Sequence, residues 1–231
     1  KHLAVLGISF VIGLTILGSF LVESKQSEKL LRVVGYATKP FESDLVKWNV
    51  TIQKPAGIDG VSAATTSLYT DVMAFKAFLM EKGIAEKDID IQPIITNPVN
   101  DNYGNLLSYN VSQNVYVVST DIKTIEDMSI NPSFFSSRGM MLQYSNLGYY
   151  YTKLPELKKA LLSEATKDAV ARMVEITSAA KSKPGKLKFA RAGVFQITEP
   201  YSTEVSDYGQ YSTSTKNKHI SVTLTAEFSL R

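Results

Sequence analysis

The 231-residue sequence contains no cysteine. This absence excludes disulfides, thiolate metal sites and attachment of a lipid to an N-terminal cysteine. If the chain is exported, its fold must therefore be held together by its core alone. About 200 residues follow the first thirty, which suits one large domain or two fused small ones.

Histidine is scarce, with His2 and His219 as the only two. A Ser-His-Asp triad or a histidine metal site would have to be built around His219, on the less apolar face of the final predicted strand. Glu42 and Asp44 offer paired carboxylates, but such a pair at a strand entrance is typical of plain surface. The run from Asn100 to Asn102 lacks the length and terminal Glu of an EF-hand loop. We therefore expect no enzymatic activity, no metal and no cofactor.

The chain also lacks a large excess of charge of one sign, because it has 25 basic and 22 acidic residues and a formal net charge of +3. No basic stripe indicates a nucleic-acid partner. The densest lysine cluster, from Lys181 to Lys188, straddles a predicted helix end, where cations complement exposed carbonyls. Helix capping is favoured there over an anionic ligand site.

The sequence does contain one long apolar run, because Leu3–Val22 carries no charge. A helix needs about 20 apolar residues to cross a bilayer. Lys1 and His2 precede the run, which favours a cytoplasmic N-terminus. We expect residues 1–29 to be an anchor in the lipid bilayer with a short linker. The protein would then be a single-pass membrane protein with residues 30–231 periplasmic or extracellular. A cleaved signal peptide, with an apolar region of about 7 to 15 residues, is the alternative and exports the same part.

Two hydrophobic periods alternate in the first half of the exported part. Strict alternation is typical of a half-buried strand, and apolar residues at steps of three and four are typical of one helix face. The patterns predict, in order, a strand at 46–52, a helix from Val61 to Leu79 ended by Gly83, a short strand at 89–95 closed by Asn97-Pro98, a turn at 100–105, and a long strand from Tyr109 to Val117.

The second half repeats this order. It shows a strand around 140–151, a helix from Pro155 with a stripe from Leu157 to Ala180, a strand at 187–197, a polar loop at 202–218, and a strictly alternating last strand from His219 to Leu230. Each half thus reads strand, helix, strand, loop, strand. We expect an α+β fold of two pseudo-repeated β-α-β-β units, in which two long helices pack on mixed or antiparallel sheet.

Several short motifs along residues 30–231 match one known family when taken in order. They are Val34-Gly35-Tyr36-Ala37, Pro40 to Asp44, Leu79 with Gly83-Ile84 and Asp88-Ile89, Tyr109 to Val117, the alanine-rich stretch from Ala160 to Ala180, and the alternating C-terminal strand. In this combination the chain resembles the SIMPL-domain family, a domain of unknown function found in exported bacterial proteins such as a periplasmic immunogen. Two connections depart from the family pattern, at Phe41-Glu42-Ser43 and at Lys183 to Leu187.

The resemblance implies a non-enzymatic protein of the cell envelope, with relatives that build ring- or cage-like homo-oligomers. It carries over no catalytic residue. We therefore expect a structural or interaction role for residues 30–231 as one SIMPL-type domain, with a second copy of the chain as partner. The alternative is a binding module that captures an envelope glycan or peptide through the loops at 97–105 and 202–218.

Tyrosines supply the candidate interface residues. Tyr149, Tyr150 and Tyr151 are consecutive, so in a strand they cannot all face one core, and Tyr208 and Tyr211 lie in the polar loop together with Tyr201. Amphipathic rings of this kind are enriched at protein interfaces and also line sugar-binding surfaces. Ordinary partial exposure explains them equally well.

Overall fold

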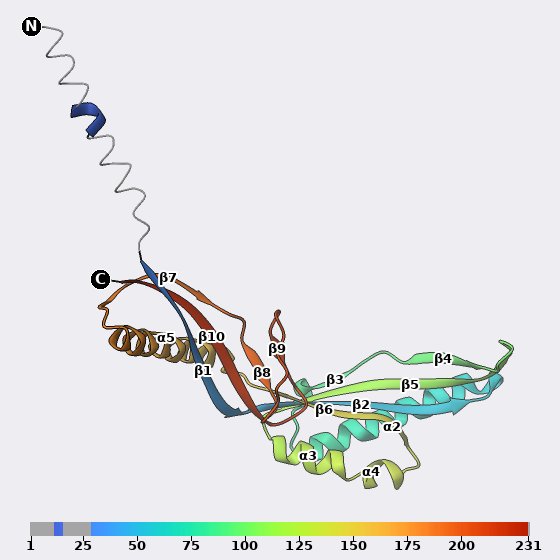
Figure 1. Ribbon diagram of the computed structural model, residues 1–231. Coiled ribbons are helices and arrows are strands. Elements are labelled where there is room, and N and C mark those ends of the chain that lie inside the picture. The colour runs from blue at the N-terminus through green and yellow to red at the C-terminus, as the bar shows by residue number, and fades with distance from the viewer. Residues whose placement is uncertain (1–11, 16–28, 231) are drawn as a thin grey trace, which may run out of the picture. The chain divides into compact units, whose positions relative to one another are not determined.

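The computed structural model of the chain describes residues 12–15 and 29–230, and Figure 1 shows the order of its elements. The strands are β1 (Leu30–Glu42), β2 (Leu45–Ala56), β3 (Ile89–Ile91), β4 (Ile95–Asn100), β5 (Leu106–Ser119), β6 (Met141–Tyr150), β7 (Pro184–Ala192), β8 (Gln196–Thr198), β9 (Gln210–Tyr211) and β10 (Asn217–Leu230). The helices are α2 (Val61–Glu81), α3 (Ile122–Ile130), α4 (Ser133–Ser136) and α5 (Leu154–Ala179), with short 3-10 turns η1 (Ile58–Gly60) and η2 (Glu86–Asp88).

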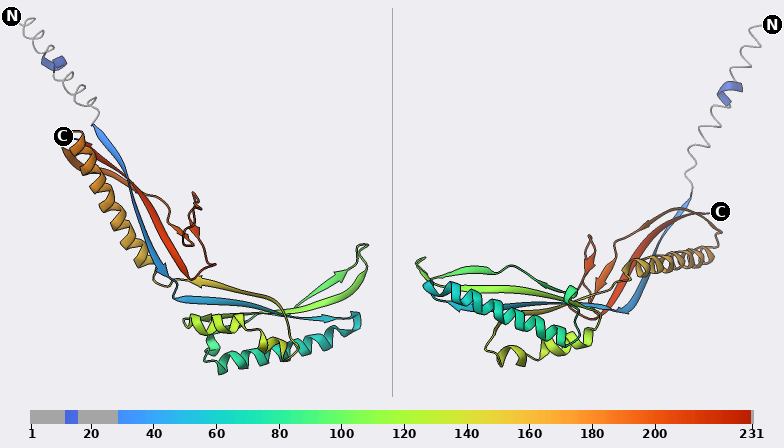
Figure 2. Two further views of the ribbon diagram at one scale, coloured as in Figure 1. Left: turned by 60° about the horizontal axis from the view of Figure 1, so that its bottom comes forward. Right: turned by 180° about the vertical axis from the view of Figure 1, so that it is seen from behind.

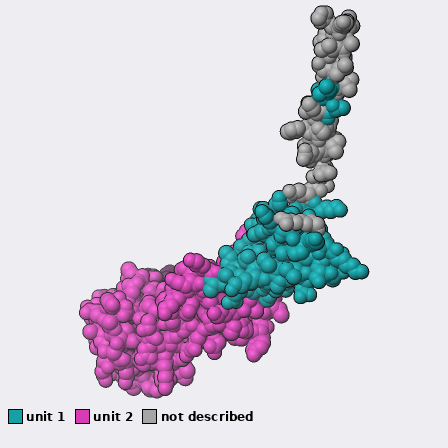
Figure 3. Space-filling model, turned by 90° about the vertical axis from the view of Figure 1, so that its left-hand side faces the viewer, with its two compact units in different colours: residues 1–37, 160–194, 222–231 teal, residues 38–159, 195–221 magenta. Residues whose placement is uncertain are grey.

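The strands form two five-stranded sheets, which confirms the predicted α+β class (Figure 2). One sheet has the order β3-β5-β2-β6, with β4 added on β5, and all its pairs are antiparallel. The other has the order β1-β10-β8-β9, with β7 added on β10, and is mixed because β8 and β9 run parallel. The chain divides into two compact units, residues 1–37, 160–194 and 222–231 in unit 1, and residues 38–159 and 195–221 in unit 2 (Figure 3).

Unit 2 is built on the antiparallel sheet and α2, which runs along one face of that sheet (Figure 2). The predicted alternation is confirmed in β2, where Trp48 lies opposite Val117 of β5 and Leu147 of β6. The predicted helical stripe is confirmed as well, since Phe75 of α2 is fully buried and meets the Trp48 ring edge-on at 5.6 Å. Together these side chains make the main apolar core of unit 2.

The predicted end of α2 is also confirmed. Gly83 has a φ of +90°, a left-handed conformation that glycine adopts without steric cost, and the N–H of Ile84 donates to the carbonyl of Leu79. The chain therefore leaves the helix directly into the turn that leads to β3.

Unit 1 combines β7 and parts of β1 and β10 with most of α5. The predicted alternation of β10 is confirmed, with Val222, Leu224, Ala226 and Phe228 all buried. The α5 stripe is confirmed from Leu157 to Met173, but Ala180 lies beyond the end of the helix and is exposed. The backbone of β1 approaches α5 closely at Gly35, where a Cβ atom would lie 2.2 Å from the carbonyl oxygen of Ala165.

Several sequence expectations need correction. Strand β1 was not predicted, and neither were α3 and α4 between β5 and β6. Asn97-Pro98 does not close a strand but lies within β4, of which the prediction had given residues 97–100 to a loop. Pro98 fits there because β4 is an edge strand that pairs with β5 alone. The strand predicted at 187–197 is two strands, β7 and β8, and Pro184 begins β7.

The strand pairing also does not follow the two consecutive repeats that the sequence predicted. β6, which was expected to open the second half, pairs with β2 of the first sheet, while the N-terminal β1 belongs to the sheet of β10. Each sheet therefore takes strands from distant parts of the chain.

The predicted membrane helix at 3–22 lies outside the described residues except for residues 12–15, which are helical. No helix in the part of the chain that the structure describes combines the length and the hydrophobicity that a bilayer crossing requires.

Candidate functional site

A buried lysine stands at the start of β10 in unit 2. Lys218 is 1% exposed, and its Nζ donates hydrogen bonds to the carbonyl oxygens of Tyr149 (3.0 Å) and Ser212 (2.8 Å). Burial lowers its pKa to about 8, and the negative charge of Glu199 only partly opposes that shift. The ammonium group thereby ties the end of β6 to the segment before β10.

Polar contacts surround this lysine in unit 2. Glu199 accepts hydrogen bonds from the hydroxyls of Ser212 and Ser214. Lys216 forms an ion pair with Glu42 at 2.8 Å, and the same carboxylate raises the pKa of Lys216. Glu42 thus forms an ordinary exposed ion pair. Nothing in this arrangement makes it an acid/base partner.

The structure brings together four of the five predicted tyrosines, Tyr149, Tyr150, Tyr151 and Tyr211, but they do not share one role. Tyr149 is 9% exposed and donates from its hydroxyl to Glu126 at 2.8 Å; burial, together with this carboxylate, raises its pKa to about 12. The Tyr150 and Tyr211 rings stack at 6.3 Å, and the N–H of Tyr151 donates to the Tyr211 hydroxyl at 3.3 Å. These rings form a partly exposed patch next to Lys218, whose Nζ lies 5.9 Å from the Tyr211 centroid.

Two further tyrosines lie apart from this patch. Tyr208 is 96% exposed at the turn before β9, and Tyr201 is 94% exposed. The ring of Tyr201 faces His219 edge-on at 6.4 Å. His219 lies on the less buried face of β10, as the alternation predicted. Among the described residues there is no group of three or more His, Cys, Asp and Glu side chains placed to hold a metal ion.

The two loops proposed for ligand capture have different structures. The loop at 97–105 reduces to the hairpin turn between β4 and β5, because residues 97–100 belong to β4. In that turn Asp101 accepts from the side-chain amide of Asn105 at 2.9 Å and from the N–H groups of Asn105 and Tyr103, both at 2.8 Å, which lowers the pKa of Asp101. This turn presents Tyr103 at 92% exposure. The 202–218 segment contains β9 and ends in the first residues of β10.

An open sheet edge lies in unit 1. β7 pairs with β10 and with no other described strand, and every residue of β7 except Gly185 is exposed, including Leu187 (48%) and Phe189 (51%). The edge strand β1 differs, because its Tyr36 N–H donates to the Asp168 carboxylate of α5 at 2.7 Å. A side chain thus covers part of the β1 edge.

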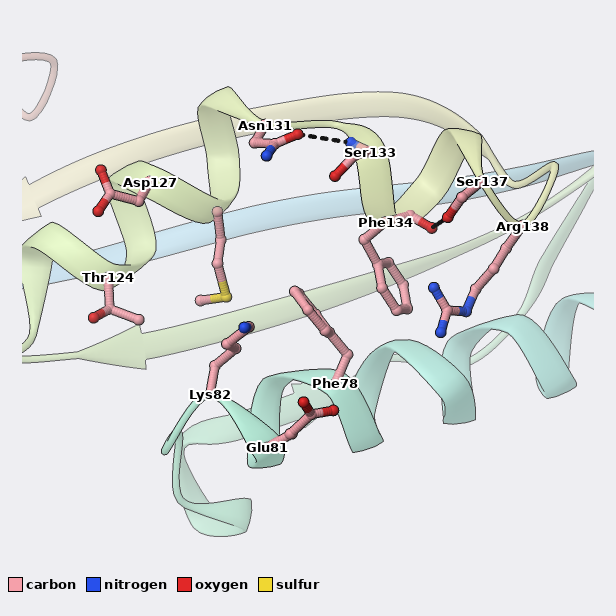
Figure 4. Close-up of a pocket in the computed structure, with 11 residues that line it drawn as sticks. Phe78, Glu81, Lys82, Thr124, Asp127, Asn131, Ser133, Phe134, Ser137 and Arg138 are labelled. Atoms are coloured by element: carbon pink, nitrogen blue, oxygen red, sulfur yellow. Dashed lines mark hydrogen bonds between the residues drawn. The ribbon is translucent and has the colours of Figure 1, made fainter.

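A pocket of about 780 Å³ opens between the end of α2, α3 and α4 in unit 2 (Figure 4). Its apolar lining comes from Phe78, Met128 and Phe134, and its charged lining comes from Glu81, Lys82, Asp127 and Arg138. The sequence interpretation missed this pocket entirely. Asp121, which caps α3 by accepting from the Thr124 N–H at 3.1 Å, was the available sequence signal for the helix that forms one wall.

The chain matches one of the known protein families. The sequence model of SIMPL, described as a protein of unknown function (DUF541), matches residues 31–228. No curated protein matches the chain. The matched span covers the elements from β1 to β10.

Proposed function

The chain belongs to the SIMPL family, and from that premise we propose that it is an exported structural protein that assembles with copies of itself in the cell envelope. The function of the family is not defined by the match, so the proposal rests on one feature of unit 1. That feature is the nine-residue edge of β7, with its apolar side chains exposed.

An uncovered edge strand presents unpaired N–H and C=O groups and pairs readily with another strand. Natural proteins protect such edges with charges, bulges or covering side chains. Asp168 covers part of β1, and β7 carries the charges of Lys186, Lys188 and Arg191 and two irregularities in its register with β10. The open edge also carries Phe189, which lies opposite Glu227 of β10. Burying one phenylalanine is worth about 1.5–3 kcal/mol. Pairing β7 with the same strand of a second copy would satisfy the backbone and bury this ring in both chains.

The test compares the mass of the full chain, solubilised in detergent, with that of two charged variants by size exclusion with light scattering. Phe189→Lys places a charge on the β7 edge and is expected to weaken association by roughly tenfold or more. Tyr69→Lys changes an aromatic residue of similar exposure (56%) on α2 and should leave the mass unchanged. A wild-type chain that is monomeric at micromolar concentration contradicts the proposal, as does an equal mass for all three proteins.

Export and anchoring rest on the sequence of Leu3–Val22. We propose a cytoplasmic N-terminus and an extracytoplasmic body. Mass spectrometry of the mature N-terminus distinguishes a retained anchor from a cleaved signal. A reporter fused next to Trp48 tests the topology, and a cytosolic signal would contradict it.

A second candidate function is capture of an envelope glycan or peptide at the β4–β5 turn. The specific observation in its favour is that hydrogen bonds to Asp101 hold this turn while Tyr103 is almost fully exposed. A turn whose backbone is already held loses less entropy on binding. Tyr103→Ala should then abolish binding to purified envelope fragments while the particle mass stays the same, and Tyr208→Ala tests the 202–218 segment in the same way. Unchanged binding by both variants would remove this candidate.

A further inference from the structure

We infer that the pocket between α2, α3 and α4 is a binding site for an apolar molecule that carries a carboxylate. The site does not depend on self-assembly, because all its residues belong to unit 2. Figure 4 shows Lys82, Phe78, Phe134 and Arg138 following one another along the pocket. The two rings are stacked with centroids 4.3 Å apart, Lys82 Nζ lies 5.5 Å from the Phe78 centroid, and the Arg138 guanidinium lies 4.2 Å from that of Phe134.

This order excludes two ligand classes. A sugar stacks on a free aromatic face, but here each ring has one face against the other ring and a cation beside it. An organic cation would be attracted to the same faces and repelled by Lys82 and Arg138. The ring edges and the side chain of Met128 remain as the apolar surface for a ligand.

Arg138 selects the charge of that ligand. Arg138 is exposed, and its guanidinium lies over the Phe134 ring. It forms no ion pair with an acidic side chain within residues 29–230. A guanidinium that stacks on a ring keeps its N–H donors directed outward in its own plane, in the fork that matches a carboxylate. Charge complementarity therefore favours an anion beside Arg138.

The position of the two acidic side chains agrees with this assignment. Asp127 lies at the end of the pocket opposite Arg138, and Glu81 extends from α2 on the Lys82 side (Figure 4). The neighbours of Arg138 along the lining are Phe134 and the uncharged Ser137. An anion at the Arg138 end thus avoids both carboxylates, and its apolar part extends along the ring edges. A volume of about 780 Å³ accommodates a small organic ligand.

The carboxylate could belong to a peptide C-terminus or to a short acyl chain, and two probes distinguish these sources. N-acetyl-L-phenylalanine and hexanoate are titrated separately into the full chain in lipid nanodiscs, with ¹³C-methyl methionine as the NMR label and Met128→Leu to assign the resonance. We expect a saturable shift of the Met128 methyl with at least one acid, at a Kd on the order of 1 mM for so small a contact. The acid that binds more tightly identifies the source.

Three controls make the result decisive. N-acetyl-L-phenylalanine amide lacks the charge and should bind roughly tenfold more weakly or not at all. Arg138→Gln should weaken binding of the acid by the same factor. Arg138→Lys keeps the charge but lacks the forked N–H donors, so it should weaken binding less. Lys87→Gln removes an exposed cation of η2 that does not line the pocket and should change nothing. Equal binding of acid and amide, an undiminished affinity in Arg138→Gln, or no saturable shift with either acid overturns the inference. Thermal unfolding of Arg138→Gln verifies that the variant is folded.

Discussion

The buried Lys218 should make the protein more stable as the pH rises above 8. In the unfolded chain the amine keeps its proton up to the ordinary lysine pKa of 10.5, whereas in the folded protein burial lowers the pKa to about 8. Between these values the unfolded state binds more protons than the folded state, so the free energy of unfolding increases with pH. The folded structure keeps both carbonyl contacts in that range, because a neutral amine still has two hydrogens to donate.

The size of the effect follows from the two pKa values. Each tenfold difference in proton affinity is worth about 1.4 kcal/mol. Integrated from pH 7 to pH 10, the depression of the Lys218 pKa corresponds to an increase of about 2–3 kcal/mol in the free energy of unfolding. Above pH 10 Tyr149 acts in the opposite direction, because its raised pKa of about 12 means that the unfolded chain loses that proton first.

Urea unfolding of wild type and Lys218→Met at pH 7, 8, 9 and 10 measures this difference. Methionine keeps an apolar stem of similar length and removes the amine, so subtracting the two curves cancels every group that both proteins share, including the oppositely shifted Lys216. The wild type should gain about 2–3 kcal/mol relative to the variant across this range. A constant difference between the two proteins at all four pH values would refute the argument that burial controls this lysine.

Two other outcomes are expected from the packing and from the β4–β5 turn. Gly35→Ala forces a methyl group into the backbone of α5 and should lower the free energy of unfolding by about 1–3 kcal/mol, whereas Gly57→Ala, with nothing within 4 Å, should have little effect in the same urea titration. Asp101→Ala removes the acceptor that holds the turn, so hydrogen exchange at the Tyr103 amide should accelerate markedly, and an unchanged rate would show that the backbone alone holds the turn.

The sequence pattern was sufficient to predict an element where one of its faces is buried and the other is exposed to solvent. β2, β10 and α2 were all predicted because their apolar positions follow the period of the element. β1 was missed because its pattern is blurred. Its inward positions include the small Gly35 and Ala37, while the outward Val34 and Tyr36 are apolar and nearly half exposed. Helix α3 could have been predicted from its Asp121 cap and the spacing of Ile122, Ile125 and Met128.

The candidate sites were less predictable than the elements. The alternation of β10 already placed Lys218 on the same face as Ile220, so a buried lysine was within reach of the sequence. The hydrogen-bond partners of Lys218 could not be predicted from the sequence, because the carbonyls of Tyr149 and Ser212 come from other segments. The sequence singled out the tyrosine run Tyr149–Tyr151 as a candidate interface, but only the structure separates the buried Tyr149 from its half-buried neighbours.

By itself, the sequence determined the class of the fold, the family, most of the strands and the two long helices, because hydrophobic period and capping act over a few residues. Only the tertiary structure decided that β6 joins β2, that β1 joins β10, and that Lys82, Phe78, Phe134 and Arg138 share one pocket. Strand pairing and pocket formation depend on side chains that meet across large separations in the chain. Their free energy comes from long-range contacts that no local pattern contains.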